Sequence, residues 1–426
     1  MSDDGAREVI AMLDVLRNPS YAKLFSAQLV ALLGTGLLTV ALGLLAFDLA
    51  GGDAGVVLGV ALTIKMLAYV GVAPVIAAVT ARVPRKVLLV TADVVRAVIA
   101  LSLPWVSEVW QIYVLIFVLQ AASATFTPAF QAVIPQVLPD EGQYTRALSL
   151  SRLAYDLESL VSPALAAALL TVIGYSDLFV GTTSGFLASA ILVLACRFPP
   201  LVAAERTSFV ERLTRGVRVF WRTPELRGLL ALNLVVAAAT AMVIVNTVVL
   251  VQGELGRPQT DVALLLAAYG AGSMIVALAL PKVLDRLPDR RVMLTGAAVL
   301  PGGLAAAALT IALPASGVSW VVAIVLWAVL GAATSLILTP AARLLRRSSS
   351  EAERPAVFAA QFSLSHACFI LTYPTAGIVG AMLGLPVVAV LLALLAAAAA
   401  AIAAIAWRNR AAPVPAAMSV DQERER

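Results

Sequence analysis

Long apolar stretches recur along almost the whole of this chain, and short segments that carry most of its charges separate them. The stretch LFSAQLVALLGTGLLTVALGLLAF, at residues 24–47, contains no charged residue. It is longer than the ~20 residues that a helix needs to cross the hydrocarbon core of a bilayer. A helix also satisfies its own backbone hydrogen bonds in lipid, whereas the alternating ten-residue segments typical of a membrane β-barrel do not occur in this sequence. The pattern therefore predicts an all-α membrane protein.

Composition excludes several other classes of protein. Hydrophobic residues make up 61% of the 426 residues and charged residues 13%, against about half and a quarter in soluble domains. A soluble fold has no room to bury so much apolar surface, so we expect neither a soluble or disordered chain nor a nucleic-acid partner. Cys196 and Cys368 lie far apart and form no disulfide framework. Residues 1–20 contain no apolar run ahead of a cleavage site, so no signal peptide is expected.

Charged residues, prolines and glycines divide the chain into twelve expected membrane spans. We place these at residues 21–49, 56–80, 87–106, 110–133, 146–173, 178–196, 226–252, 262–284, 292–314, 320–341, 357–383 and 385–407. If the N-terminus lies inside, the inner segments carry 26 of the 30 Lys and Arg residues, and the outer loops carry only Arg257. The positive-inside rule then predicts a multi-pass protein of the plasma (bacterial inner) membrane with both termini in the cytoplasm.

The longest inner segment divides the helices six and six. The expected organisation is a cytoplasmic arm at 1–20, a six-helix bundle at 21–196, a cytoplasmic amphipathic linker at 197–225, a second bundle at 226–407 and a cytoplasmic tail at 408–426. In the linker, Phe209, Leu213, Val217 and Phe220 share one helical face that arginines surround. This pattern favours an interfacial helix on anionic lipid headgroups, with a regulatory helix as the alternative.

The two halves repeat each other at an offset of 205 residues. Pro19 and Gln28 recur as Pro224 and Asn233. A basic turn after the second span returns after the eighth, and the two turns comprise Arg82, Arg85 and Lys86, then Arg286, Arg290 and Arg291. Internal repeats of this kind are typical of transporters whose halves move around a central site.

Over residues 15–407 the chain resembles the major facilitator superfamily. Its loop ARVPRK, at 81–86, is similar to that family's G-x-x-x-D-R-x-x-R-R signature, with Ala77 and Ala81 at the Gly and Asp positions. The resemblance implies two pseudo-symmetric six-helix bundles and transport by alternating access. It also implies conformational-switch loops that contain Arg82, Arg85, Lys86, Asp285 and Arg286.

A finer resemblance points to the exporter branch of this family. The segment FTPAFQAVIPQVL (126–138) is similar to that branch, and SRLAYDLE (151–158) is most similar to its nickel-resistance exporters. The implied substrate is a divalent cation such as nickel or cobalt; the alternative is a drug, macrolide or siderophore. Nickel exporters often end in a histidine-rich tail, whereas this chain contains one histidine.

Two charged residues within the spans have no partner on their own helix. Lys65 lies in the second span and Glu158 in the fifth, each among uncharged neighbours. A charge at the bilayer centre costs about 2.5–3.5 kcal/mol on insertion scales, so each must meet another helix or a water-filled cavity. We predict that Glu158 carries protons or binds a cation. For Lys65 we favour an interhelical ion pair over contact with substrate.

Two further pairs of charges can be neutralised locally. Asp93 and Arg96 are three residues apart, and Arg152 and Asp156 are four apart, spacings that place partners on one helix face. We favour structural ion pairs for both. Asp156 and Asp93 follow Glu158 as candidate proton-binding residues.

One group of residues forms a candidate metal site. His366 and Cys368 lie in the eleventh span, and Met66 adjoins Lys65. Imidazole, thiol and thioether ligands suit nickel, cobalt or zinc. His366 and Cys368 point to different faces of a helix, however, and a hydrogen-bonded structural histidine is the simpler interpretation.

Uncharged polar residues complete the expected central cavity. They lie on the first, fourth, seventh and tenth spans: Gln28, Thr35, Gln120, Asn233, Asn246, Thr334 and Ser335. The alternative is that they form ordinary hydrogen bonds between helices. No nucleotide-binding, zinc-protease or nucleophile-elbow motif occurs. The sequence thus predicts a monomeric, proton-driven transporter of a small molecule or metal ion, with no cofactor and no enzymatic activity; a receptor that moves nothing is the remaining alternative.

Overall fold

The computed structural model describes residues 14–72, 83–196, 209–284, 286–314, 316–350 and 353–408, and these segments are helical almost throughout. In the first half, the long helices are α2 (Pro19–Ala50), α3 (Ala54–Leu67), α5 (Arg85–Ser102), α6 (Val109–Val137), α7 (Glu141–Leu169) and α8 (Tyr175–Leu194). Short helical turns accompany them: η1 (Asp14–Arg17), η2 (Gly51–Asp53), η3 (Ala68–Val72) and η4 (Leu103–Trp105).

The second half begins after α9 (Phe209–Arg222), the helix that forms in the linker segment. Its long helices are α10 (Pro224–Val248), α11 (Gln259–Leu284), α12 (Asp289–Ala312), α13 (Gly317–Arg347), α14 (Arg354–Pro374) and α16 (Leu385–Arg408). Two π-helical segments, η5 (Val249–Glu254) and η6 (Thr375–Val379), extend α10 and α14, and η6 continues into the short α15 (Gly380–Leu383).

These helices confirm the expected all-α membrane fold. Ten stretches of the described chain are long and apolar enough to cross a membrane, and the first, Pro19–Gly71, contains both α2 and α3. The charged helix α7 is the twelfth long helix. Helix α7 begins five residues before its expected span and ends four residues before that span ends, and α13 continues six residues past its expected end. Polar residues continue both helices outside the apolar region. Asp140 caps the first turn of α7, and Arg346 and Arg347 lie in the last turn of α13.

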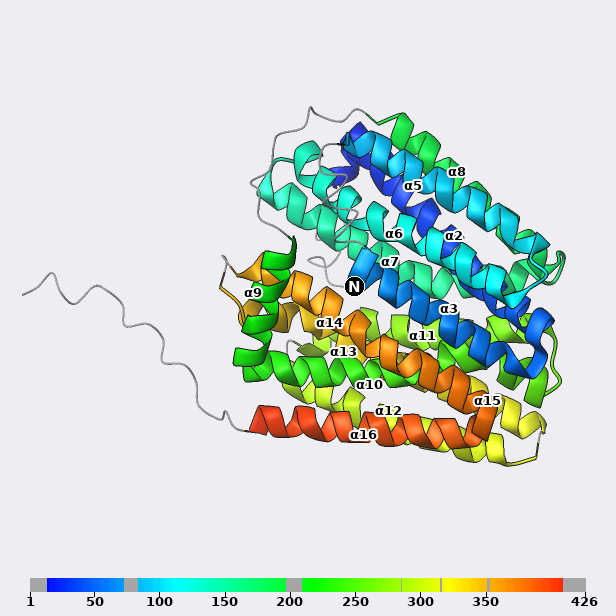
Figure 1. Cartoon of the computed structure of the whole chain (residues 1–426). Coiled ribbons are helices and arrows are strands. Elements are labelled where there is room, and N and C mark those ends of the chain that lie inside the picture. The colour runs from blue at the N-terminus through cyan, green and yellow to red at the C-terminus, as the bar shows by residue number, and fades with distance from the viewer. Residues whose placement is uncertain are drawn as a thin grey trace, which may run out of the picture.

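The two halves are built on the same pattern of helix contacts (Figure 1). Helix α2 packs on α8 as α10 packs on α16, and α5 packs on α6 as α12 packs on α13. Between the halves, α3 contacts α14 and α7 contacts α11. The second and eighth long helices correspond in the repeat, as do the fifth and eleventh, so the two contacts between halves are related by the same pseudo-twofold symmetry.

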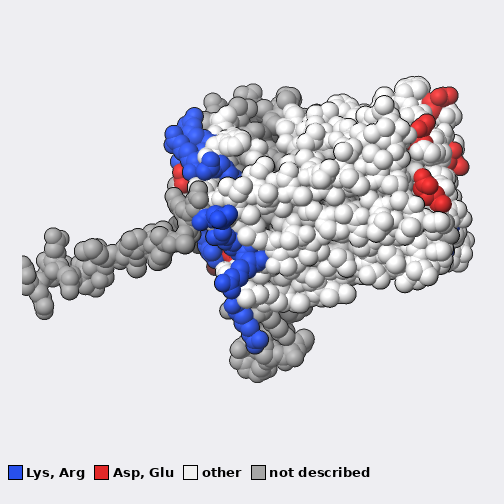
Figure 2. Space-filling view, turned by 90° about the horizontal axis from the view of Figure 1, so that it is seen from below, with Lys and Arg blue, Asp and Glu red and all other residues white. Residues whose placement is uncertain are grey.

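On the face of the molecule shown in Figure 2, surface charges gather at the two ends of the helices, with an uncharged surface between them. We call one end the acidic end, and its acidic residues are Asp48, Asp53, Glu108, Asp177, Glu254 and Asp261. The opposite, basic end carries most of the Lys and Arg residues that the structure describes, including Lys23, Lys86, Arg222, Arg291 and Arg347. Exposed tryptophans lie near both ends, Trp105 and Trp110 at the acidic end and Trp221 at the basic end. This is the charge and aromatic distribution of a protein that spans a bilayer.

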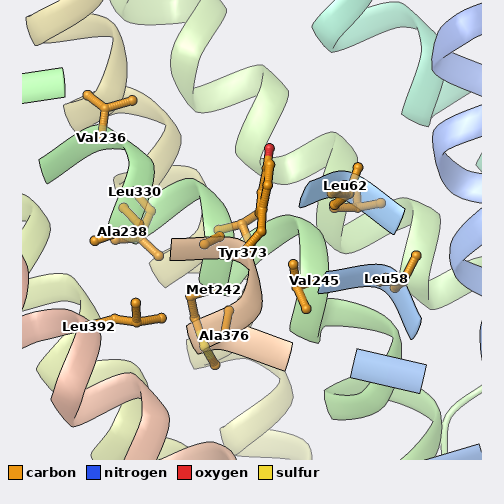
Figure 3. Close-up of a cluster of buried hydrophobic side chains, with 14 of the residues drawn as sticks. Leu58, Leu62, Val236, Ala238, Met242, Val245, Leu330, Tyr373, Ala376 and Leu392 are labelled. Atoms are coloured by element: carbon orange, nitrogen blue, oxygen red, sulfur yellow. The ribbon is translucent and has the colours of Figure 1, made fainter. Parts of the chain in front are cut away.

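The halves share one apolar core towards the acidic end. Leu58 and Leu62 of α3 lie in the same buried cluster as Val245, Tyr373 and residues of α16 (Figure 3). Backbones approach closely there. A Cβ added to Gly377 would lie 2.1 Å from the carbonyl oxygen of Gly55, and a Cβ added to Gly59 would lie 2.6 Å from that of Tyr373. Glycines therefore allow the backbone of α3 to lie directly against those of α14 and η6 towards the acidic end.

Candidate functional site

Lys65 of α3 and Glu158 of α7 lie within range of each other's charge, although no ion pair of 4.0 Å or less joins them. Each side chain is half-buried. Lys65 lies eleven residues after the start of α3 and Glu158 eleven residues before the end of α7. At 1.5 Å per residue, both lie ~17 Å from the acidic ends of their helices. The structure thus brings together the two charged residues that have no partner on their own helices.

A glycine on a third helix makes room for Glu158. A Cβ added to Gly36 of α2 would lie 2.7 Å from Glu158 Oε1 and 2.1 Å from the Ser162 Cβ. Such distances do not occur between real Cβ atoms and these neighbours without a shift. The Glu158 carboxylate therefore lies directly against the backbone of α2.

Aromatic rings lie beside this charged pair. The Lys65 ammonium lies 6.0 Å from the centroid of the Tyr69 ring. Tyr69 belongs to the π-helical turn η3, and its ring lies 5.5 Å from that of His366 and 6.0 Å from that of Phe362. The Phe362 and His366 rings, both on α14, are 4.2 Å apart. One region thus combines a carboxylate, an ammonium and three rings from both halves of the chain.

Asp93 and Arg96 form a separate, more deeply buried pair. Arg96 donates to Asp93 Oδ1, and Ser189 of α8 donates to Asp93 Oδ2 at 2.7 Å. The Arg96 guanidinium lies over the rings of Phe126 and Phe186, at 4.3 and 4.5 Å from their centroids. Neither charge is more than 5% exposed. This geometry favours a pair that joins α5 to α6 and α8 over a group that exchanges protons with solvent.

Matching polar contacts occur at repeated positions in the two halves. Ser151 of α7 donates to Gln28 Oε1 of α2 at 3.0 Å. In the second half, Asn233 of α10 and Gln361 of α14 exchange two amide hydrogen bonds, of 3.2 and 3.3 Å. Each contact joins the first helix of its half to the fifth. Gln28 and Asn233 are thus used for hydrogen bonds between helices.

The other uncharged polar residues lie at several different places. Tyr269 of α11 donates to Thr334 at 3.3 Å and lies 3.2 Å from the Thr240 hydroxyl. Asn246 donates to the carbonyl of Ala376 at 3.1 Å, close to the glycine contact at the acidic end. Gln120 is buried in α6. Thr35 Oγ1 donates to the carbonyl of Ala31 in its own helix.

The proposed metal ligands gain no support from their positions. His366 Nδ1 lies 2.6 Å from the carbonyl oxygen of Phe362, and the Cys368 thiol donates to that of Leu364. Met66 is buried in the apolar core. Within the described part of the chain, no group of three or more His, Cys, Asp or Glu side chains is arranged to hold a metal ion.

Several predicted switch residues lie at the basic end. Lys86 donates to the carbonyl of Cys196 at 3.0 Å, and Lys23 donates to that of Ala195 at 3.1 Å, so both neutralise the C-terminus of α8. Arg85 is half-buried and Arg286 is exposed. Arg82, Asp285 and the side chains of Arg152 and Asp156 lie outside the described residues.

The sequence analysis missed an acidic residue in the second switch loop. Asp289, almost fully buried at the start of α12, lies 3.0 Å from Arg347 and 3.6 Å from Arg343 of α13. The signal was present in the sequence, because Asp289 precedes the repeated basic pair Arg290 and Arg291.

Comparison with known sequences identifies the family and several relatives of this chain. The Major Facilitator Superfamily profile matches residues 24–300 and 229–423. Macrolide efflux protein A of Streptococcus pyogenes is 27% identical over 220 residues, which are 50% of this chain and 53% of that protein. An uncharacterized MFS-type transporter of Bacillus subtilis, YfiS, is 26% identical over 213 residues, 48% of this chain and 50% of that protein. The chain thus spans about half the length of these curated relatives.

Solved structures extend the similarity to almost the whole chain. The nucleoside transporter NupG superposes with a TM-score of 0.71 at 13% identity, covering 92% of this chain and 99% of that one. A bacterial homolog of the human lysosomal transporter Spinster, in an inward-facing and unoccupied conformation, also gives 0.71, at 15% identity, covering 92% and 96%. Identities this low establish a shared fold and nothing finer.

Proposed function

Because the chain belongs to the Major Facilitator Superfamily and is a membrane transporter of small molecules, we propose that it exports amphipathic organic compounds in exchange for protons. The observation that carries this proposal is the position of the Glu158 carboxylate against the backbone of α2 inside the membrane, at the depth of Lys65 and its neighbouring rings from both halves. The organisation into an arm at 1–20, bundles at 21–196 and 226–407, a linker at 197–225 and a tail at 408–426 is part of the same proposal.

In this scheme three cations compete for the Glu158 carboxylate. In the empty protein the Lys65 ammonium attracts this carboxylate across the space between α3 and α7. A basic group of the substrate replaces Lys65, and a proton that enters from the opposite side replaces the substrate. A carboxylate in an apolar wall suits this task, because loss of its charge removes most of its attraction for a bound cation.

The aromatic surroundings favour an organic substrate. Tyr69, Phe362 and His366 offer ring faces, which attract both apolar surfaces and ammonium groups. A macrolide has both, a large apolar ring and a basic amino sugar, and a relative that matches half of this chain is named as a macrolide efflux protein. The prediction of a nickel or cobalt substrate has no comparable support, because the described residues form no metal-binding cluster.

The charge distribution supports a cytoplasmic location for the basic end. Lys and Arg are retained on the cytoplasmic side of plasma membranes, and they gather at this end (Figure 2). The glycine contact between α3 and η6 closes the opposite end. With this orientation, the structure corresponds to a state in which the Lys65–Glu158 region is shut off from the outside.

A transport assay tests the proposal directly. We expect purified protein in liposomes with an acidic lumen to accumulate erythromycin faster than protein-free liposomes do, and to alkalinise the lumen in step, because protons leave as the drug enters. Glu158→Gln should abolish both fluxes and leave the protein folded. Erythromycin movement that is indifferent to the gradient and to Glu158→Gln would refute proton exchange, and gradient-driven movement of Ni²⁺ or Co²⁺ in place of the macrolide would restore the metal hypothesis.

A further inference from the structure

An arginine-lined recess lies at the basic end, outside the candidate transport site. There α9 crosses the ends of the membrane helices and does not run alongside them (Figure 1). Arg215, Arg218 and Arg222 line a recess of about 300 Å³ together with Val219, Thr223, Ser348 and Glu353. The spacing of the arginines, three and then four residues, places their guanidinium groups on one face of the helix.

The opposite face of α9 holds the helix against α14. Phe220 is 1% exposed, and a Cβ added to Gly216 would lie 2.0 Å from the carbonyl oxygen of Ala356. The backbone of α9 therefore rests on the first turn of α14. The arginine face is left for a ligand, because α9 is already docked through its small and apolar residues.

The recess has an excess of positive charge. The described residues that line the recess include three guanidinium groups and one carboxylate, that of Glu353. This carboxylate already accepts a hydrogen bond of 2.7 Å from Ser350. Thr223 and Ser348 add hydroxyl groups to the lining. Guanidinium groups with neighbouring hydroxyls form charge-assisted hydrogen bonds with phosphate oxygens.

The position of α9 indicates which phosphate is available. Trp221 is 61% exposed on this helix, and exposed tryptophans beside arginines are typical of the headgroup layer of a membrane. We propose that the recess binds the phosphate of an anionic phospholipid from the leaflet that meets the basic end. The acyl chains of such a lipid extend into the bilayer beside α14.

This site connects the lipid to the transport machinery through α14. The helix that α9 contacts at Ala356 also carries Gln361, Phe362 and His366. A lipid that fixes α9 restrains the basic end of α14, which must move when access to the central site changes. The proposal therefore includes a dependence of transport rate on anionic lipid.

Thermal unfolding in detergent measures binding without any assumption about cargo. The probes are dihexanoyl phosphatidylglycerol, dihexanoyl phosphatidylcholine and inorganic phosphate. We compare the wild type with Arg215→Gln/Arg218→Gln/Arg222→Gln and with a matched control, Arg146→Gln/Arg227→Gln/Arg408→Gln, which removes three exposed arginines of the same end that do not line the recess. We expect the phosphatidylglycerol to raise the melting temperature of the wild type and the control, and the recess variant to need about tenfold more of it.

Each other outcome overturns part of the proposal. If both triple variants need equally more phosphatidylglycerol than the wild type, the lipid is attracted to the basic surface in general and not to the recess. If phosphatidylglycerol does not raise the melting temperature of the wild type, there is no lipid site. Equal stabilisation by inorganic phosphate would mean a site for soluble phosphate and not for lipid. If the triple variant fails to fold, the single variants Arg218→Gln and Ser348→Ala provide the same comparison.

A second measurement tests the link to transport. In phosphatidylcholine vesicles, a fifth of the lipid is replaced by phosphatidylglycerol, and the transport rate is measured for wild type, recess variant and control. We expect severalfold stimulation of the wild type and the control but not of the recess variant. Equal stimulation of all three would overturn the coupling, whereas the melting measurement still decides binding if the assigned cargo is wrong.

Discussion

Glu158 and Gly36 occupy adjoining space, such that a Cβ on Gly36 would lie 2.7 Å from Glu158 Oε1. The same added atom would lie 2.2 Å from Ser162 Oγ. Helix α2 therefore determines where the carboxylate of α7 lies, although neither residue attracts the other by charge. The position of the proposed proton carrier depends on the absence of a side chain.

We expect Gly36→Ala to reduce transport about tenfold, because overpacking costs about 1–3 kcal/mol and here displaces Glu158. Gly43→Ala on the same helix is the matched control, since a Cβ there would meet one atom, Leu58 Cδ1, at 4.0 Å. Adding Ser162→Gly to Gly36→Ala should recover part of the activity. Initial rates in liposomes measure all three variants. Full activity of Gly36→Ala would show that Glu158 needs no fixed position.

Removal of one member of the Lys65–Glu158 pair should be worse for stability than removal of both. Lys65→Met leaves the half-buried Glu158 carboxylate without its compensating charge, so we expect a lower melting temperature. The double variant Lys65→Met/Glu158→Gln should regain most of the lost melting temperature but remain inactive. Scanning fluorimetry and transport rates separate the two effects. A double variant as unstable as Lys65→Met alone would contradict the pairing.

The sequence was sufficient to predict the fold. Long apolar stretches and the distribution of basic residues predicted twelve spans, and the helices begin and end within a few residues of most of them. The larger differences occur where polar residues continue a helix beyond the apolar band, as at the start of α7 and the end of α13. Hydropathy locates the apolar part of a helix and carries no information about such extensions.

The site could be predicted only in part. The isolation of Lys65 and Glu158 in apolar segments predicted that each would meet another helix, but no local pattern identified the two as partners. The repeat aligned Gln28 with Asn233 but did not identify Gln361, because the offset of 205 takes Ser151 to Ala356 and the 211 residues between Pro163 and Pro374 take it to Phe362. Contacts such as that of Phe362 with Tyr69 depend on how the halves meet, which sequence spacing does not determine.

The closed acidic end should open when its glycines gain side chains. Gly377→Val would push α3 away from η6, since a Cβ there would lie 2.1 Å from the Gly55 carbonyl oxygen. We expect a cysteine introduced at Leu62 to react several times faster with a membrane-impermeant maleimide added to intact cells. Gly302→Ala is the control, as a Cβ there meets no atom within 4 Å. An unchanged labelling rate would show that other contacts keep this end closed.

The rings beside Lys65 should decide what the protein carries. The rings of Phe362 and His366 lie 4.2 Å apart at an interplanar angle of 36°, and Tyr69 of the other half lies beside both. If they form a surface for an apolar cation, Phe362→Ala should raise the erythromycin concentration at half-maximal transport about tenfold, because loss of aromatic contact and buried area costs about 1–2 kcal/mol. His366→Phe should retain most of the transport, since it preserves a ring and removes the imidazole. A metal carrier requires the opposite result: Phe362→Ala leaves transport of Ni²⁺ or Co²⁺ unchanged, and His366→Phe abolishes it, because a phenyl ring provides no ligand atom. Measuring the two variants against both cargoes therefore distinguishes an organic cation surface from a metal site.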